Sequence, residues 1–328
     1  MIGSKLKNVL ITGANGFVGR ALCRKLQADG VKVHGAVRAN KSSSLPEGVE
    51  PREIANIDAL TDWTGILGGI DTVVHLAARV HVMQERAADP IAEYHKVNVA
   101  GTRQLACAAR EAEVKRFVFL STIKVNGEKN VRPYRESDPP APEDAYAISK
   151  LQAEEQLKEI AAASGMELVI LRPPLVYGPG VKANFLALIK MVAKGVPLPL
   201  ANIPNRRSFI YLKNLTDVIS ACCIHPDAGG KVFIVSDGED VSTPELIRCI
   251  AESLNVPARL FPCPALLLFF FGRILGKGAA LDRLIGSLAV DISRIRKELD
   301  WEPPYTLEQG MKETASWYIK DFRKPISP

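Results

Sequence analysis

The chain has 328 residues, which at about 150 residues per domain is a prior for roughly two domains. Apolar residues make up 47% and charged residues 24% of the chain, and this ordinary globular mix excludes a disordered chain, a collagen-like repeat and a disulfide miniprotein. The 42 Lys and Arg against 36 Asp and Glu leave a net charge of +6 spread along the chain, which favours an anionic small molecule over a nucleic acid as partner.

Short apolar, β-branched runs alternate with amphipathic stretches through the first half of the chain. Strands are expected at residues 9–12, 31–37, 72–76, 117–121 and 168–171, and helices at residues 17–28, 92–111 and 145–163. Short apolar strands separated by helices indicate right-handed βαβ units. The expected fold class is therefore α/β, a Rossmann-type doubly wound parallel sheet with helices on both faces.

The second half of the chain is less regular. A helix is expected at 184–194, and strands at 209–212 and 232–235 flank a further helix at 215–224. Thr243 followed by Pro244 fits a helix N-cap, and Thr306 with Gln309 fits a capping box. We expect a dinucleotide-binding domain over 1–176, to which the chain returns around 207–240, and a smaller α/β substrate domain over 177–328.

The segment GANGFVG directly follows the first strand and opens the first helix. Glycines in that position let the backbone approach a pyrophosphate, whose charge is met by N–H groups at the helix N-terminus. The turn therefore predicts a dinucleotide site. Its expected cofactor contacts are Gly13, Asn15, Gly16, Phe17, Val18 and Gly19.

The end of the second strand bears on which dinucleotide binds. An acidic residue there would accept hydrogen bonds from the ribose 2′-hydroxyl, whereas an arginine accommodates a 2′-phosphate. The chain reads VRANKSSS, with Arg38 and Lys41 and no Asp or Glu. This favours NADP(H), and NAD(H) is the alternative.

A tyrosine and a lysine lie four residues apart in the helical stretch DAYAISK. That spacing places Tyr146 and Lys150 on one face, where the ammonium favours the phenolate and makes the tyrosine an acid or base. Thr122 ends the fourth expected strand, at the carboxyl edge where open α/β sheets bind ligands. The three side chains are expected to form one site.

Taken together, TGANGFVG, HLAA, NVAGT, the Ser121-Thr122 strand end, YAISK and LRPPLVYGPG resemble the extended short-chain dehydrogenases/reductases. Within them, the chain is most similar to the nucleotide-sugar epimerases, dehydratases and 4-keto reductases typified by UDP-glucose 4-epimerase. The resemblance implies a UDP-sugar substrate bound by the 177–328 domain, and a homodimer.

The same resemblance assigns roles to residues. Thr122, Tyr146 and Lys150 become the catalytic set, in which the phenol exchanges a proton with the sugar oxygen. The further cofactor contacts that it implies are Asn56, Ile57, Leu76, Ala77 and Ala78, beside Arg38, Tyr146 and Lys150. The substrate contacts that it implies are Thr122, Lys124, Asn184, Leu200, Arg207 and Arg283.

The sequence excludes a dehydratase and leaves three functions open. Dehydratases of this group follow the threonine with an Asp-Glu pair, and Ile123 and Lys124 cannot perform that elimination. Arg38 favours NADPH-dependent reduction of a UDP-4-keto-6-deoxy-HexNAc in bacterial surface-polysaccharide synthesis. The alternatives are a UDP-glucose or UDP-N-acetylglucosamine 4-epimerase with bound NAD, and a non-catalytic NADP-sensing protein of the same fold.

The cysteines and the apolar segments indicate the cellular compartment of the protein. The six cysteines show no C-x-x-C or zinc-ligand spacing, so we expect reduced thiols, no metal site and a cytoplasmic protein. No apolar stretch approaches the roughly 20 residues of a membrane span. The run ALLLFFF at 265–271, followed by basic residues, is expected to dock on the substrate domain or a subunit interface. A peripheral membrane contact is its alternative, and would suit a lipid-diphosphate-linked sugar.

Overall fold

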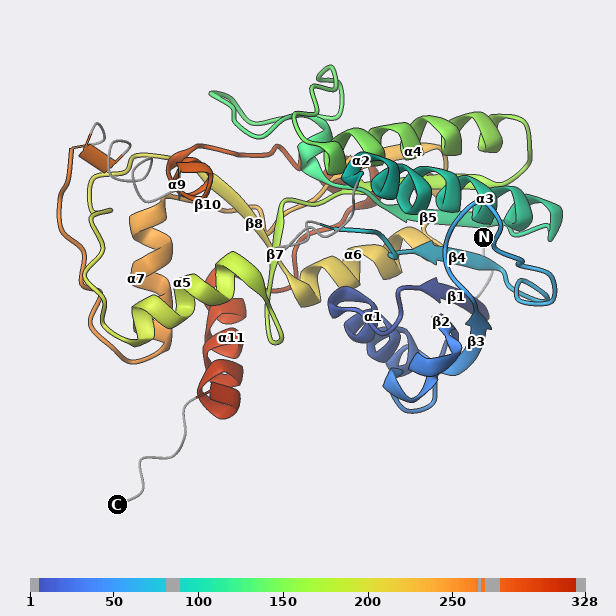
Figure 1. Cartoon of the computed structure of the whole chain (residues 1–328), viewed down its shortest axis with the longest axis horizontal. Helices are drawn as coiled ribbons and strands as arrows, with labels where there is room; N and C mark the ends of the chain where they lie inside the picture. Colours follow the sequence, from blue (N-terminus) through green and yellow to red (C-terminus); the bar gives the residue numbers. More distant parts are fainter. Residues whose placement is uncertain (1–5, 81–88, 265–266, 269–277, 323–328) are drawn as a thin grey trace.

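The computed structural model describes residues 6–80, 89–264, 267–268 and 278–322, without the side chains of 279–281 and 283. A seven-stranded parallel sheet forms its larger part, in the order β3-β2-β1-β4-β5-β6-β9 (Figure 1). Its strands are β1 (Asn8–Thr12), β2 (Lys32–Arg38), β3 (Glu50–Ile54), β4 (Thr72–His75), β5 (Arg116–Leu120), β6 (Glu167–Arg172) and β9 (Lys231–Ile234). The predicted doubly wound α/β fold is confirmed.

Helices cover both faces of this sheet (Figure 1). On one face α3 packs on α4, and on the other α1 packs on α6. Strand residues alternate between the two layers: Leu10 and Val73 join the core under α3 and α4, whereas Ile11 and Val74 join the core under α1 and α6. The helices of the chain's first two thirds are α1 (Phe17–Ala28), α2 (Pro90–Tyr94), α3 (Gly101–Glu111), α4 (Ala145–Ala162), α5 (Ala183–Ala193) and α6 (Leu212–Ile224).

A second, three-stranded sheet has the order β10-β8-β7. Its strands are β7 (Leu175–Tyr177), β8 (Arg207–Tyr211) and β10 (Asp240–Val241), and the helices around it include α7 (Thr243–Ser253), α9 (Gly278–Ile285) and α11 (Leu307–Phe322). Helix α10 (Ser293–Leu299) packs instead on β9 of the larger sheet. Tyr177, Phe209 and Tyr211 form a separate core with α5, α7 and α11. β9 enters the larger sheet from this half of the chain, beside β6. The division at residue 176 stays a prediction.

The structure departs from several expected elements. The helix expected at 92–111 is divided into α2, a π-helical segment (His95–Ala100) and α3. The N-cap of α7 is Ser242, not Thr243, because Ser242 and Glu245 form the capping box there. Strand β3 was not expected. Thr306 and Gln309 do form the predicted reciprocal hydrogen bonds, at 3.0 and 3.3 Å.

The described residues cover only part of two predictions, those on membrane-spanning helices and on the apolar segment 265–271. Among the described helices, none combines the length and apolar character needed to cross a membrane. Of the apolar segment 265–271, the structure describes only Leu267 and Leu268. Leu268 is buried in the core around α5 and α7, and Leu267 is exposed.

Candidate active site

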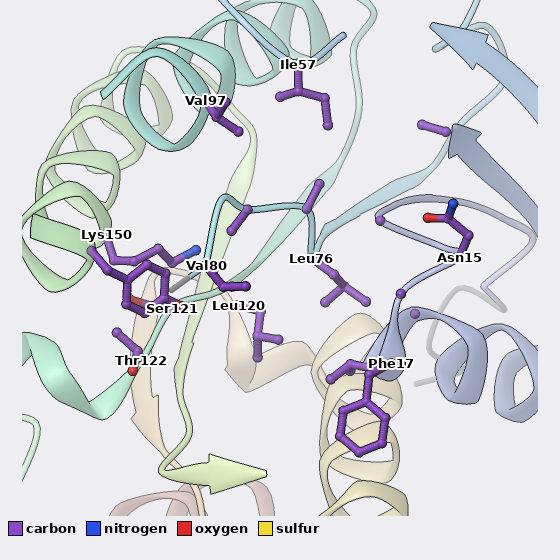
Figure 2. Close-up of a pocket in the computed structure, with 18 of the residues that line it drawn as sticks. Asn15, Phe17, Ile57, Leu76, Val80, Val97, Leu120, Ser121, Thr122 and Lys150 are labelled. Atoms are coloured by element: carbon purple, nitrogen blue, oxygen red, sulfur yellow. The ribbon is translucent and has the colours of Figure 1, made fainter. Parts of the chain in front are cut away.

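A cavity of about 790 Å³ lies at the carboxyl ends of the parallel strands. Thr122 and Lys150 lie together on one side of it, and Asn15 and Phe17 lie across from them (Figure 2). All the residues predicted to bind the cofactor line it: Gly13, Asn15, Gly16, Phe17, Val18, Gly19, Arg38, Asn56, Ile57, Leu76, Ala77, Ala78, Tyr146 and Lys150. The sequence prediction missed other lining residues, among them Glu93, Lys96 and Val97.

The glycine turn between β1 and α1 is packed so closely that side chains are excluded. A Cβ on Gly19 would lie 2.1 Å from the carbonyl oxygen of Gly13, and one on Gly13 would lie 2.9 Å from the amide nitrogen of Ala77. Gly13 also has a φ of +69°, which favours glycine. The amino end of α1 lines the cavity, and because a helix N-terminus attracts anions this arrangement fits a dinucleotide pyrophosphate.

The loop after β2 holds its polar groups in internal contacts. Ser42 Oγ donates to Glu53 Oε1 at 2.7 Å, and Asn15 Nδ2 donates to Ser44 Oγ at 3.1 Å. Glu53 on β3 pairs in register with Val37, the residue before Arg38. A carboxylate beside this loop opposes the approach of a second phosphate group. Arg38 lines the cavity, but Ser42 and Ser44 of the same loop already take part in hydrogen bonds within the protein.

Helix α4 places two reactive side chains in the cavity. Asp144 caps the helix by accepting a hydrogen bond from Ala147 N at 2.7 Å, and Tyr146 and Lys150 follow one turn apart. Burial raises the pKa of Tyr146. Burial lowers the pKa of Lys150 to about 7, against the opposing charge of Glu154. Near neutral pH the lysine therefore carries a proton only part of the time in the absence of ligand.

Thr122 follows β5 and begins the 3-10 turn Ile123–Val125, where its Oγ1 accepts a hydrogen bond from Lys124 N at 3.3 Å. It lines the cavity with Tyr146 and Lys150, so the three predicted catalytic residues come together. A hydroxyl, a phenol and an ammonium at one end of a dinucleotide cleft can bind an oxygen and move a proton to or from it.

A buried histidine, His75, supports the wall of the cavity through a chain of hydrogen bonds. His75 Nδ1 lies 2.6 Å from Thr12 Oγ1, and its Nε2 lies 2.9 Å from Thr102 Oγ1. Ala77 N donates to Thr12 Oγ1 at 3.2 Å, which continues the chain to the cavity wall. Burial, helped by the charge of Lys150, lowers the pKa of His75 to about 3, so the ring is neutral.

Of the predicted substrate contacts whose side chains the structure describes, Thr122 lines this cavity and the others do not. Lys124 Nζ is 2.6 Å from both Glu128 Oε1 and Asp144 Oδ2. Arg207 Nη1 donates to the carbonyl of Gly286 at 2.8 Å, and burial lowers its pKa. Asn184 is exposed on the first turn of α5, Leu200 is buried in the α5–α7 core, and the side chain of Arg283 on α9 lies outside the described residues. Their roles stay predictions.

The sheet, the glycine turn and the Thr-Tyr-Lys set together define an enzyme of the extended short-chain dehydrogenase/reductase class. The chain belongs to the NAD dependent epimerase/dehydratase family, whose model matches residues 9–236. This confirms the predicted superfamily.

Two relatives that match nearly the full length of the chain carry epimerase names. The chain is 46% identical over 321 residues to UDP-glucose 4-epimerase from Vibrio cholerae, covering 96% of each. It is 30% identical to N-acetyl-alpha-D-glucosaminyl-diphospho-ditrans,octacis-undecaprenol 4-epimerase from Escherichia coli O157:H7, covering 97% of each. The structure of MoeE5 in complex with UDP-glucose and NAD superposes with a TM-score of 0.76 at 26% identity, over 95% of this chain and 99% of that one.

Proposed function

We propose that the chain inverts the configuration at C4 of a UDP-linked hexose, with NAD as its bound cofactor. The observation that carries this proposal is the Thr122–Tyr146–Lys150 set beside a dinucleotide cleft, in a chain that shares 46% identity with a UDP-glucose 4-epimerase. This proposal replaces the NADPH-dependent 4-keto reductase, which the sequence favoured because of Arg38. Neither the family description nor these relatives' names support a reductase.

The cofactor proposal rests on the cleft and on MoeE5. The cleft has the glycine cradle for a pyrophosphate, and MoeE5 was solved with NAD. The predicted preference for NADP(H) has no such support, and Ser42 and Glu53 bond to each other beside the position that a 2′-phosphate would need. We therefore propose NAD.

The residues divide the proton chemistry between them. When bound, the nicotinamide supplies the hydride acceptor and donor for C4. Tyr146, as phenolate, takes the proton from the C4 hydroxyl as the hydride leaves, and returns it to the same oxygen after the sugar presents its other face. Thr122 donates a hydrogen bond to that oxygen, and the Lys150 ammonium stabilises the phenolate. No net oxidant or reductant is consumed.

Substrate binding is proposed to involve the second half of the chain. Arg207 donates one hydrogen bond to the carbonyl of Gly286. Its guanidinium is suited to a diphosphate because a guanidinium binds phosphate oxygens in pairs. We propose the division predicted above, with 1–176 and the return around 207–240 holding the cofactor and 177–328 holding the sugar nucleotide.

NMR of sugar nucleotides tests the proposal. The NAD-loaded protein is incubated separately with UDP-glucose and UDP-N-acetylglucosamine, and the C4 epimer of at least one should grow to an equilibrium ratio. Tyr146→Phe should abolish this conversion. Tyr134→Phe is the control, because that hydroxyl donates to the Lys129 carbonyl, away from the cavity.

One second candidate remains, because Arg38 lines the cavity at the end of β2. It is reduction of a UDP-4-keto-6-deoxy-HexNAc by NADPH. The same NMR assay with that sugar and NADPH separates the two: reduction here, without inversion in the first arm, would overturn the epimerase proposal. A further arm offers polyprenyl-diphosphate-linked N-acetylglucosamine, the type of compound in the second relative's name.

A further inference from the structure

A buried ion pair lies behind the reactive residues and has no part in the chemistry described so far. Arg172 at the end of β6 contacts Glu154 of α4 through two hydrogen bonds, Nη2 to Oε2 at 2.5 Å and Nε to Oε1 at 3.0 Å. The two side chains are 4% and 0% exposed. Burying two charges costs hydration that their attraction recovers only in part, so stability alone is a poor explanation for the pair.

The pair is bonded to the two segments that flank Thr122. Ser121 Oγ donates to Glu154 Oε1 at 2.5 Å, and Ser121 directly precedes Thr122. Arg172 Nη1 donates to Asn126 Oδ1 at 3.0 Å, at the end of the turn that Thr122 begins. The strand end before Thr122 and the turn after it are therefore held to α4 and β6 by one connected set of hydrogen bonds.

The same carboxylate lies next to the catalytic lysine along the helix. Tyr146, Lys150 and Glu154 are spaced four residues apart, which places them along one face of α4. Lys150 Nζ lies 3.8 Å from the centre of the Phe119 ring. The charge of Glu154 is the one that opposes the loss of the lysine's proton on burial.

We propose that the Glu154–Arg172 pair is a positioning device, which holds Thr122 against the helix bearing Tyr146 and Lys150 and gives the lysine its nearby negative charge. The inference rests on the function proposed above. Glu154 and Arg172 touch neither sugar nor cofactor in it. They act through Ser121, Asn126 and Lys150.

The test removes the pair as a whole. In the double variant Glu154→Leu/Arg172→Met, two apolar side chains replace the ions, so no uncompensated charge stays buried and the chain is expected to fold. The matched control is Arg116→Met/Glu167→Leu. That pair joins β5 to β6 at their amino ends, the opposite end of β6 from Arg172, with Arg116 Nε donating to Glu167 Oε2 at 2.8 Å.

The readouts are kcat, KM and NAD affinity of the wild type and both double variants. Loss of positioning should lower kcat by about 10-fold to 100-fold, since small misplacements of reacting groups have effects of that order. NAD affinity and KM should stay close to wild type, and the control should keep its kcat. A Glu154→Leu/Arg172→Met enzyme with wild-type kcat would overturn the proposal.

A single variant keeps the proposal testable should the double variant unfold. Ser121→Ala leaves the ion pair intact and removes one hydrogen bond to it. It should lower kcat by about 5-fold, the equivalent of one ordinary hydrogen bond. An unchanged kcat in a folded Ser121→Ala protein would also count against the proposal.

A titration without sugar distinguishes failure of this inference from failure of the proposed function. Ultraviolet absorbance follows tyrosinate formation in the NAD-loaded protein, and a Tyr146→Phe background in each form isolates the Tyr146 signal. The ionisation midpoint should move to higher pH in the Glu154→Leu/Arg172→Met form and stay unchanged in the control. An unmoved midpoint would refute the electrostatic part of the proposal, whichever sugar is the substrate.

Other charges near the site set the baseline of that titration. Asp144 at the start of α4 and Tyr94 on α2 face the Tyr146 phenol, and both oppose its ionisation. His75 on β4 faces Lys150 and is neutral. The remaining charged side chains on the cavity wall are Arg38, Asp58, Glu93 and Lys96. All of these stay in place in both double variants, so the comparison isolates the pair.

Discussion

Gly19 on the first turn of α1 offers a test of the dinucleotide site that needs no knowledge of the sugar. The Cβ of Gly19→Ala would lie 2.1 Å from Gly13 O and 2.8 and 2.9 Å from two backbone atoms of Ala14. Backbone cannot rotate aside as a side chain can. The turn and the helix must separate by about 0.9 Å for the first contact to reach 3.0 Å.

The magnitude follows from two opposing terms. Alanine is the better helix former by about 1 kcal/mol, whereas forcing an extra carbon into a packed site typically costs about 1–3 kcal/mol. The net loss in free energy of unfolding should be about 0–2 kcal/mol. The displaced turn should also lose at least one charge-assisted hydrogen bond to pyrophosphate, about 1.5–3 kcal/mol, so the Kd for NAD should rise about 10-fold to 100-fold.

Calorimetric titration with NAD and urea unfolding measure these two effects. The matched control is Gly165→Ala, whose Cβ would meet nothing within 4 Å and whose φ is not positive. That variant should bind NAD as the wild type does and gain about 0.4–1 kcal/mol in stability. A Gly19→Ala protein with wild-type affinity for NAD would refute the assignment of this turn to the pyrophosphate.

Four further predictions concern the chemistry, the cofactor, the substrate and pH. On the proposed function, Tyr146→Phe should lower kcat by about 100-fold or more and leave the Kd for NAD nearly unchanged, and a fully active variant would exclude the phenol as acid and base. The wild type should bind NAD more tightly than NADP in a calorimetric titration, and Arg38→Asp should widen that difference in affinity. Tighter binding of NADP by the wild type would favour the NADPH-dependent reductase over the epimerase. Arg207→Met should raise KM for the UDP-sugar about 10-fold to 100-fold with little change in kcat, and an equal fall in kcat and kcat/KM would place its effect in the transition state instead. Burial raises the pKa of Asp237 from 3.8 to about 6, so its contribution to stability is complete below about pH 4 and is lost as pH rises through about 6. The wild type should therefore lose about 2–3 kcal/mol relative to Asp237→Asn between those pH values in urea unfolding, and a constant difference would contradict the raised pKa.

The sheet and the cofactor cleft could be predicted because their signals are local. Apolar β-branched runs identify the central strands, and GANGFVG follows the first of them directly. Strand β3, with the sequence EPREI, lies at the sheet edge and has little buried surface, so it lacks that signal. The π-helical segment His95–Ala100 has the same apolar spacing as an ordinary helix, and its register change is not visible in the sequence.

The supporting contacts of the site could not be predicted because their partners are far apart in the chain. His75 lies between threonines 63 and 27 residues away, and nothing in HLAA announces them. Glu154 belongs to the polar run AEEQ, which suggests a solvated helix face. It is nevertheless fully buried, and its carboxylate is hydrogen-bonded to Arg172 and Ser121. The residues next to Arg38 in the sequence likewise do not show that Glu53 lies beside the loop, because Glu53 is on a strand that was not expected.

The charges behind the cavity constrain one another. His75 stacks on Phe119 with ring centres 5.7 Å apart, and Lys150 contacts the same ring, so a protonated His75 would put two cations beside one buried aromatic. Its pKa of about 3 keeps the histidine neutral, so Lys150 does not share the Phe119 ring with a second cation. Glu154, although shared with Arg172, is the anion that favours that cation. A change at His75 or Glu154 should therefore alter the surroundings of the Lys150 ammonium, and through that charge the ionisation of Tyr146.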